Sequence, residues 1–590
     1  GMAIEDVEYR AKDILDVMAG SVNLGLMRTQ GYFFRKFYRH MYQGIFVDEV
    51  GIKKVITAAK RGPIILIPTH RSYLDFLLTS FIFYDHDLPV PRIAAGDDFL
   101  NMAIVSWIFR NSGAFFMRRS HGKDELYRQI FNEYVKGVIT NGHPLEFFIE
   151  GTRSRVGKSL PPKLGLLSNI IHATLGDTSD LEHVSICPIA ISYERIVEEQ
   201  SHAHELAGQP KEKPTTTALV KAAFNKLIHQ NYGRISIQFA QPIEINEFVS
   251  NFSGSQKGGF DPLENPDDLW RVSGSLGHTI IDSFHQEMVM MPTQILAAVI
   301  MVHRTGISRD RLAERFGWLR DQLVLRGRRI DPIGGSNEEI IQHCRPLLRG
   351  LFTEKRNIIE VEIVRGQTNI HVMQLSMYRN GILHSLQREG IVALVLASFG
   401  DCGYNDGVRM DNFLNAHSFL SGLLVDEFVD RHRDECVRDT LDLMEKMGLI
   451  SIEKRNYEFI QVHEGAEHEM FEFLLELFGP FVDSLWLSAT TLLSLENKRL
   501  GVMERMMVER AQWFGEKSFF EKMMAYFDAT SKESIRAALK VFIRTGMLEV
   551  DDSTCITLSP SLEADGKILR AFIERIAAFR RPVCAASFAR

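Results

Sequence analysis

Cysteine is scarce in this chain, which has six copies in 590 residues. No two of them form a C-x-x-C pair, so neither a structural zinc site nor a disulfide framework is predicted. The pattern indicates a reducing compartment or an organelle without oxidative folding. The six residues are Cys187, Cys344, Cys402, Cys436, Cys555 and Cys584.

Long apolar runs are also missing. The most apolar stretches, at 288–302 and 390–399, are too short or too interrupted to span a bilayer, which takes about 18 to 20 apolar residues. The first residues, "GMAIEDVEYRAKDILD", are acidic and lack the apolar core of a signal peptide. We expect that, if a membrane is involved, the protein lies on its surface.

Positive charge is not in excess either. The net charge is −7, which argues against a nucleic-acid-binding protein but leaves room for a local phosphate site. The G-x-S-x-G elbow of serine hydrolases and the H-E-x-x-H helix of zinc proteases are both absent. The segment "GTRSRVGKS" (151–159) is not a nucleotide P-loop, because five residues separate its glycines where that motif has four.

Short apolar strands alternate with helical spacing from about residue 50 to 245. This order predicts an α/β domain over 49–250, with a largely parallel sheet covered by helices. The strand candidates are 63–67, 90–96, 113–119, 144–151, 184–193 and 234–243.

The rest of the chain is predicted to be mainly helical. An N-terminal helical segment (1–48) ends in the aromatic, basic patch "GYFFRKFYRHMYQGIF", which fits either a packed helical hairpin or an interfacial segment at a lipid headgroup layer. A linker rich in Gly, Ser, Pro and Asn is predicted at 251–268. A large C-terminal region, 269–590, follows.

Two segments of the C-terminal region echo one another. Residues 441–462 and 539–560 each read as a helix, a glycine and a strand hairpin, and in both a leucine precedes the glycine by seven residues. Such helix-plus-hairpin units resemble winged-helix modules. Acidic residues are interleaved with the basic ones, so packing or protein interaction is favoured over nucleic-acid binding.

His70 and Asp75 follow the apolar run "PIILI", and their spacing decides whether the two side chains can form a catalytic pair. Within one continuous helix five positions advance about 500°, so the two side chains would lie about 140° apart and could not touch. If "PTH" is a turn and the helix begins near Ser72, the imidazole and the carboxylate can meet. The pair would then be a general base with its orienting acid. The alternative is that His70 only caps the helix.

Polar residues also follow two other predicted strands. Arg118 and Arg119 come after "GAFFM", and Glu150, Gly151, Thr152, Arg153, Ser154 and Arg155 come after "FFI". Ligands bind at the carboxyl ends of parallel strands, and guanidinium groups hold phosphate in a bidentate manner. An anionic ligand is therefore predicted at this edge, against the alternative of a surface salt-bridge cluster.

Four stretches occur in a known order: "HRSYLD" (70–75), "GAFFMRR" (113–119), "FIEGTRSR" (148–155) and "CPIAISY" (187–193). They resemble the four sequential blocks of the glycerolipid acyltransferase superfamily. The stretches "GTRSRVGKSLPPKLGLL", "ISYERIVEE" and "LAGQPKEKPTTTALVKA" resemble, more narrowly, the dihydroxyacetone-phosphate branch of the glycerol-3-phosphate/dihydroxyacetone-phosphate acyltransferase family.

The resemblance implies a role for each block. His70 would deprotonate the acceptor hydroxyl and Asp75 would orient it, so that the acyl group leaves acyl-CoA in one step without a metal or another cofactor. The implied phosphate contacts are Arg118, Glu150, Gly151, Arg153 and Arg155. Secondary contacts are Ser72, Arg119 and Ser154, with Pro188 shaping the pocket. Segment 99–116 is either ordinary core or a wall of the acyl channel.

The sequence alone leaves more than one candidate for the acyl acceptor. Dihydroxyacetone phosphate, the first step of ether phospholipid synthesis, is the primary hypothesis. Glycerol 3-phosphate is the first alternative, and a non-catalytic lipid- or partner-binding scaffold on the same fold is the second. The resemblance also implies long-chain acyl-CoA, a peripheral membrane surface, a peroxisomal location and alkylglycerone-phosphate synthase as a partner. The last three residues, Phe588-Ala589-Arg590, do not fit the peroxisomal Ser-Lys-Leu type.

Overall fold

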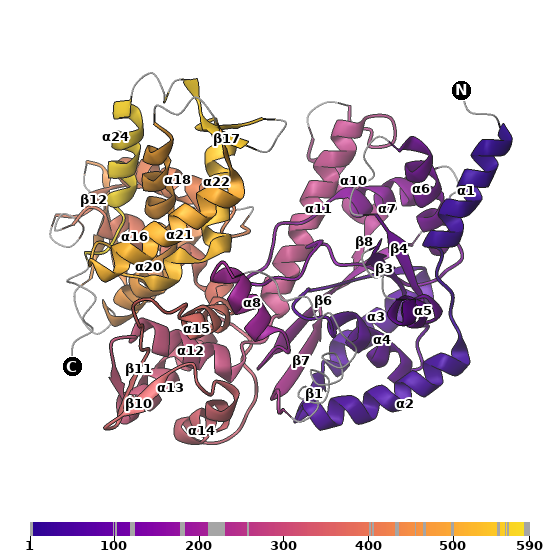
Figure 1. Ribbon diagram of the computed structural model, residues 1–590, viewed down its shortest axis with the longest axis horizontal. Coiled ribbons are helices and arrows are strands. Elements are labelled where there is room, and N and C mark those ends of the chain that lie inside the picture. Colours follow the sequence, from indigo (N-terminus) through magenta and orange to yellow (C-terminus); the bar gives the residue numbers. More distant parts are fainter. Residues whose placement is uncertain are drawn as a thin grey trace. The chain divides into compact units, whose positions relative to one another are not determined.

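The computed structural model (Figure 1) places most of the chain in regular helices and strands. Two compact units result: a sheet unit of Gly1–Ser154, Ser159–Val197 and Thr215–Val289, and a helical unit of Arg155–Lys158, Glu198–Pro214 and Met290–Arg590. The structure describes residues 4–582 except 98–99, 101–102, 119–123, 177–182, 210–229, 257–258, 401–402, 404–405, 431–435, 455, 464–467, 497–500, 552–554, 561 and 563–565.

The sheet unit is built on an eight-stranded sheet with the order β1-β7-β6-β2-β5-β3-β4, and β8 pairs with β6. The pairs β2–β6, β2–β5, β3–β5, β3–β4 and β1–β7 are parallel, whereas β7 and β8 run antiparallel to β6. The strands are β1 (Gly44–Val47), β2 (Ile64–Pro68), β3 (Arg92–Gly96), β4 (Ala114–Met117), β5 (Leu145–Glu146), β6 (Ser185–Tyr193), β7 (Arg234–Phe239) and β8 (Ile243–Glu244). The predicted largely parallel sheet is confirmed, and β1 is an additional edge strand.

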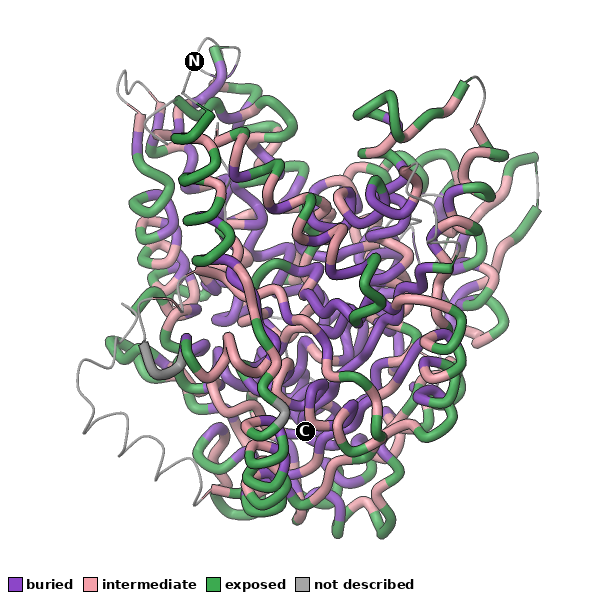
Figure 2. Tube along the Cα trace, turned by 90° about the vertical axis from the view of Figure 1, so that its right-hand side faces the viewer, coloured by how far each residue is buried: buried purple, intermediate pink, exposed green. Residues whose placement is uncertain are grey.

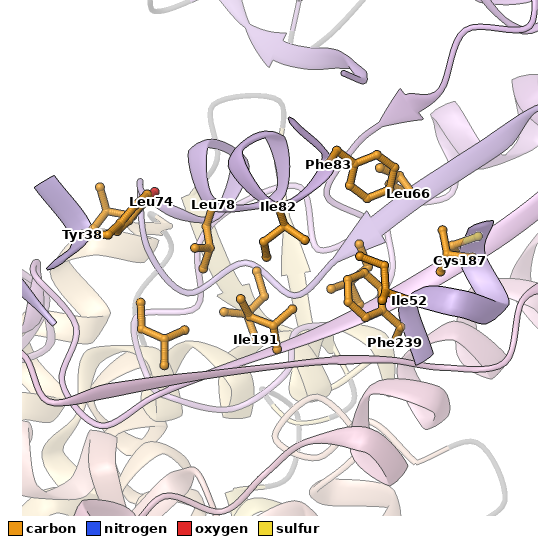
Figure 3. Close-up of a cluster of buried hydrophobic side chains, with 14 of the residues drawn as sticks. Tyr38, Ile52, Leu66, Leu74, Leu78, Ile82, Phe83, Cys187, Ile191 and Phe239 are labelled. Carbon is orange, nitrogen blue, oxygen red and sulfur yellow. The ribbon is translucent and has the colours of Figure 1, made fainter. Parts of the chain in front are cut away.

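Helices cover this sheet because its central strands are apolar on both faces. All five residues of β2 and all nine of β6 are buried. In Figure 3, Leu78 and Ile82 of α4 point toward Ile191 of β6, and Phe83 of the same helix lies beside Leu66 of β2. The helices are α1 (Ile4–Met18), α2 (Leu24–Met41), α3 (Glu49–Arg61), α4 (Asp75–Asp85), α5 (Ala103–Asn111), α6 (Glu125–Thr140), α7 (Gly165–Leu175), α10 (Ile245–Gly254) and α11 (Pro266–Glu287).

The expected linker at 251–268 lies inside the sheet unit. Helix α10 extends to Gly254, and α11 begins at Pro266 after the side chain of Asn265 caps its first turn. Helix α11 packs on α7 and β6, so the sheet unit continues to Val289. Because α11 also buries an apolar face, the polar composition before it marks a loop within the unit.

The helical unit contains three modules with the same order: a helix, a two-residue strand, two helices and a hairpin. The first is α12 (Pro292–Val302), β9 (Ile307–Ser308), α13 (Arg309–Leu325), α14 (Asn337–Leu347), β10 (Thr353–Lys355) and β11 (Ile358–Glu360). The second is α16 (Gln387–Ala397), β12 (Val408–Arg409), α18 (Met410–Leu423), α19 (Val437–Lys446), β13 (Ile450–Lys454) and β14 (Glu458–Val462). The third is α20 (His468–Thr491), β15 (Val502–Met503), α21 (Glu504–Phe520), α22 (Lys532–Arg544), β16 (Leu548–Val550) and β17 (Cys555–Leu558).

Each module forms its own three-stranded sheet. The glycine after the third helix has a positive φ in every module, 82° at Gly350 and 71° at Gly448 and Gly546, and these glycines are 98 residues apart. The two predicted helix-plus-hairpin units are therefore the ends of the second and third modules. Helices α8 (Glu199–Leu206), α15 (Ile370–Asn380) and α24 (Gly566–Ala577) complete the unit.

Buried residues gather inside, and exposed residues follow the outward sides of the helices (Figure 2). Among the residues that the structure describes, no helix has the length and apolar character that crossing a bilayer requires.

Candidate functional site

The turn between β2 and α4 brings His70 and Asp75 together. The backbone leaves β2 at Pro68 and becomes helical only at Asp75, three residues later than the sequence suggests. The imidazole Nδ1 of His70 lies 3.0 Å from Oδ2 of Asp75. The two side chains meet because five residues separate them across a turn instead of along a helix.

The carboxylate of Asp75 is buried and held by further donors. Its Oδ2 accepts the backbone N–H groups of Arg71 at 2.6 Å and Ser72 at 2.8 Å. Its Oδ1 accepts the hydroxyl of Tyr193 at 2.6 Å, from the end of β6. Together with the imidazole, these donors offset the cost of burying a negative charge and fix the plane of the carboxylate.

The imidazole of His70 is oriented on two sides. A carboxylate can only accept, so Nδ1 carries the hydrogen and Nε2 carries the lone pair. The ring stacks on Phe148, with centroids 3.9 Å apart and planes 20° apart. The side chain keeps 16% of its surface exposed, and Nε2 has no hydrogen-bond partner within the described part of the chain. The arrangement suits a neutral base that takes a proton at Nε2.

Glu150 holds the backbone of this turn. Its Oε1 accepts the N–H of His70 at 2.9 Å, and its Oε2 accepts the N–H of Leu160 at 2.9 Å and contacts Arg71 at 3.5 Å. The carboxylate is buried, and both oxygens are used on the chain itself. These contacts differ from the predicted contact with a phosphate, which a carboxylate would repel.

The loop after Glu150 also touches His70. Gly151 has a φ of +67°, which explains the glycine, and the N–H of Ser154 donates to the carbonyl of His70 at 2.9 Å. The guanidinium of Arg153 lies 3.3 Å from the ring centroid of Tyr73, which is 44% exposed. Arg153 therefore projects from a loop that is hydrogen-bonded directly to the candidate base.

The next four residues, Arg155–Lys158, belong to the helical unit. Arg155 pairs with Glu205 at 3.1 Å. Lys158 forms a buried ion pair with Glu427 and lies 4.4 Å from the ring centroid of Phe481. The side-chain amide of Asn380 donates to the carbonyl of Val156 at 2.8 Å. Arg155 therefore forms an ion pair within the helical unit, whereas the sequence predicted that it would contact the phosphate.

Arg118 stands apart from the dyad. Strand β4 is three strands from β2, which corresponds to about 14 Å across the sheet. Its guanidinium pairs with Asp124 at 2.8 Å and lies over the ring of Tyr127. The neighbouring Arg119 lies outside the described residues.

Two further predicted residues have structural contacts. The hydroxyl of Ser72 accepts the N–H of Leu74 at 3.2 Å, within the turn before α4. Pro188 is buried in β6 opposite Ile67 of β2, and its carbonyl accepts the N–H of Ala240 at 3.0 Å. Both residues shape the turn and the strand next to the dyad.

Two buried groups near Asp75 were not anticipated. Burial, and then the negative charge of Asp75, raise the pKa of Glu146 in β5 well above its ordinary value. The same two causes raise the pKa of Tyr193 well above its ordinary value, so its hydroxyl stays protonated and donates. Tyr193 ends the "CPIAISY" stretch, but its distance from Asp75 in the sequence, 118 residues, hides the contact.

The residue that follows Asp75, Phe76, lines a small apolar cavity of about 30 Å³. Phe76 and Ser80 of α4 line it together with Phe34 of α2, Phe109 of α5 and Ile93 of β3. Segment 99–116, which the sequence leaves as ordinary core or channel wall, contributes Ile108, Phe109, Ser112 and Ala114 to the lining. Within the described ranges no cluster of three or more His, Cys, Asp or Glu side chains could hold a metal ion.

Known protein families match both halves of this chain. A family model described as "Acyltransferase" matches residues 49–192, and one described as "Glycerol-3-phosphate acyltransferase C-terminal region" matches residues 202–551. Dihydroxyacetone phosphate acyltransferase from Oryctolagus cuniculus is 32% identical over 91% of this chain and 79% of that protein. The Homo sapiens protein of the same name is 31% identical over 93% and 81%.

Mitochondrial glycerol-3-phosphate acyltransferase 1 from Sus scrofa is 28% identical over 67% of this chain and 52% of that protein. The matches cover both units, and the match to residues 49–192 contains His70, Asp75, Glu150 and Tyr73 but ends one residue before Tyr193. The chain belongs to the family of glycerol-3-phosphate and dihydroxyacetone phosphate acyltransferases.

Proposed function

We propose that this acyltransferase moves a long-chain acyl group from acyl-CoA to the hydroxyl of dihydroxyacetone phosphate, the first step of ether phospholipid synthesis. One observation carries the proposal: Asp75 fixes the proton on Nδ1 of His70, which leaves Nε2 as a base on a ring that is stacked and partly exposed. General-base catalysis contributes about 10²- to 10⁴-fold in rate.

The reaction needs no covalent enzyme intermediate in this scheme. Nε2 of His70 takes the hydroxyl proton while the hydroxyl oxygen attacks the thioester carbon. The carbon–sulfur bond then breaks, and the departing CoA sulfur takes the proton back from the imidazolium. Asp75 stabilises the imidazolium between these steps. We expect neither a metal nor another cofactor to take part.

The phosphate of the acceptor is the natural ligand for Arg153. Its loop is hydrogen-bonded to His70, and a guanidinium matches a phosphate in charge and geometry. Arg118 is a candidate for an outer contact, since it lies farther across the sheet. Replacement of Arg153 with alanine is expected to raise the KM for the acceptor about tenfold or more, the loss of one or two charged hydrogen bonds.

The cavity beside Phe76 supports an acyl-chain position between α2, α4 and α5. The cavity of about 30 Å³ has room for about two water molecules, so the lining helices would have to separate to admit a long acyl chain. Exposed aromatic side chains on α2, Tyr32 and Phe33, support a peripheral contact with a lipid surface. A peroxisomal location and alkylglycerone-phosphate synthase as partner follow from the family resemblance alone.

Glycerol 3-phosphate is the second candidate acceptor, because relatives named glycerol-3-phosphate acyltransferase also match this chain. Release of CoA from palmitoyl-CoA, measured with each acceptor in turn, separates the two. We expect the larger kcat/KM with dihydroxyacetone phosphate, and a clear preference for glycerol 3-phosphate would overturn the choice.

Three variants accompany this assay. Replacement of His70 with alanine should abolish transfer with both acceptors while the protein remains folded. Arg153→Ala should raise the acceptor KM and leave the KM for palmitoyl-CoA unchanged. Arg128→Ala, a matched control on the exposed side of α6, should change neither. An unaltered acceptor KM in Arg153→Ala would remove this arginine from the phosphate site.

A further inference from the structure

The carboxylate of Asp75 is held unevenly by its donors. Oδ2 receives three N–H groups, from the imidazole and from the backbone of Arg71 and Ser72. Oδ1 receives a single donor, the hydroxyl of Tyr193, at 2.6 Å. All the donors to Oδ2 come from the same short turn, whereas Tyr193 comes from another strand of the sheet.

We propose that Tyr193 is a positioning residue for the acyl transfer, which acts by holding Oδ1 of Asp75 and thereby sets the strength of the His70 base. The proposal rests on the proposed function, in which His70 takes the acceptor proton. A hydrogen bond from a hydroxyl draws negative charge toward Oδ1 and away from the imidazole. It also prevents rotation of the carboxylate about its Cβ–Cγ bond.

Tyr193 is itself rigidly placed. It is buried at the end of β6, where it pairs with Ile235 of the antiparallel strand β7. Its ring contacts the ring of Tyr42, with centroids 6.3 Å apart, and Tyr42 in turn contacts Tyr232 at 5.8 Å. A side chain held by a strand and by aromatic packing can fix a carboxylate more firmly than a surface residue can.

Besides Tyr193 and its ring neighbour Tyr42, several charged or titratable groups lie around the pair. Arg71 lies on the same turn, Glu150 follows β5, Glu146 lies on β5 itself, and Tyr38 lies on α2. Among these groups, Tyr38 provides a matched control. Its hydroxyl is buried within the electrostatic reach of Asp75 but has no hydrogen-bond partner among the described residues. Tyr38→Phe therefore removes a buried hydroxyl from the same aromatic cluster without removing a hydrogen bond to Asp75.

The test is the pH dependence of kcat/KM for the full chain, measured by CoA release with whichever acceptor the wild type esterifies. Tyr193→Phe removes the hydroxyl that donates to Asp75, so more of the carboxylate's negative charge faces the imidazole. That charge stabilises the imidazolium form of His70. The acidic limb of the profile should move to higher pH, and kcat should fall about tenfold, as expected for one hydrogen bond to a charged group. Tyr38→Phe should leave both unchanged.

A fluorinated tyrosine at position 193 keeps the hydrogen bond and makes the hydroxyl a stronger donor. The acidic limb should then move to lower pH, which also tests the proposal if Tyr193→Phe fails to fold. An acidic limb that stays in place in either folded variant, or a loss of thermal stability alone, overturns the positioning role. A wild type that is inactive with both acceptors contradicts the proposed function instead.

Discussion

Replacement of Asp75 with asparagine isolates the charge of the dyad from its geometry. The amide oxygen can take the place of Oδ2 and keep the N–H groups of Arg71 and Ser72 as donors. The amide NH₂ then faces the Tyr193 hydroxyl, which can accept as well as donate. We therefore expect Asp75→Asn to fold, with a melting temperature close to that of the wild type.

Catalysis should suffer much more than stability. The dyad nitrogen and oxygen are 3.0 Å apart. Charge centres about 4 Å apart attract by about 4 kcal/mol at an effective dielectric constant of about 20. At about 1.4 kcal/mol for each factor of ten, loss of the carboxylate charge lowers kcat by about 10³-fold at most.

The assay is CoA release from palmitoyl-CoA at saturating acceptor, with thermal unfolding measured in parallel. Asp85→Asn is the control, since Asp85 ends the same helix and forms an exposed ion pair with Arg35. This control should retain wild-type kcat. An Asp75→Asn variant whose kcat stays within about threefold of the wild type would refute the assignment of a charged dyad.

Two further predictions concern stability. Lys158→Met leaves the Glu427 carboxylate buried without its cation and should destabilise the helical unit by about 3 kcal/mol. The double variant Lys158→Met/Glu427→Leu should recover most of that loss, because neither charge is then buried alone. Calorimetric melting that shows an equal loss of stability in both variants would contradict this. Burial raises the pKa of Glu146 in the folded state, so its contribution to stability is fully present below the pKa of the unfolded chain. As the pH rises from there toward the folded pKa, the free energy of unfolding falls by about 1.4 kcal/mol per pH unit. Glu146→Gln should therefore be more stable than the wild type at neutral pH, with a difference that shrinks toward pH 4.5, the ordinary value; denaturant unfolding at both pH values tests this.

The sheet and the dyad were accessible from sequence because their signals are local. Strand β2 reads as an unbroken apolar run, and the spacing of His70 and Asp75 permits contact only across a turn. The start of α4 was misplaced by three residues, since Ser72 resembles an N-cap but the helix begins at Asp75.

Contacts between distant residues could not be predicted in the same way. Tyr193 donates to a residue 118 positions earlier, and Lys158 pairs with a residue 269 positions later. Neither has a local pattern that distinguishes it from an ordinary strand-end tyrosine or a surface lysine. The first helical module was missed for a simpler reason: the residue seven positions before Gly350 is His343, where the other two modules have leucine.

The assignment of Arg155–Lys158 to the helical unit affects how members of this family can be recombined. A chimera that joins the first 289 residues of one relative to the remainder of another would place Val156 and Lys158 from one parent against Asn380 and Glu427 from the other. Exchange of the helical half therefore requires that this tetrapeptide, and the described residues 198–209, come from the same parent as residue 290 onward. The boundary that recombination must respect is spatial, and a single cut in the gene cannot reproduce it.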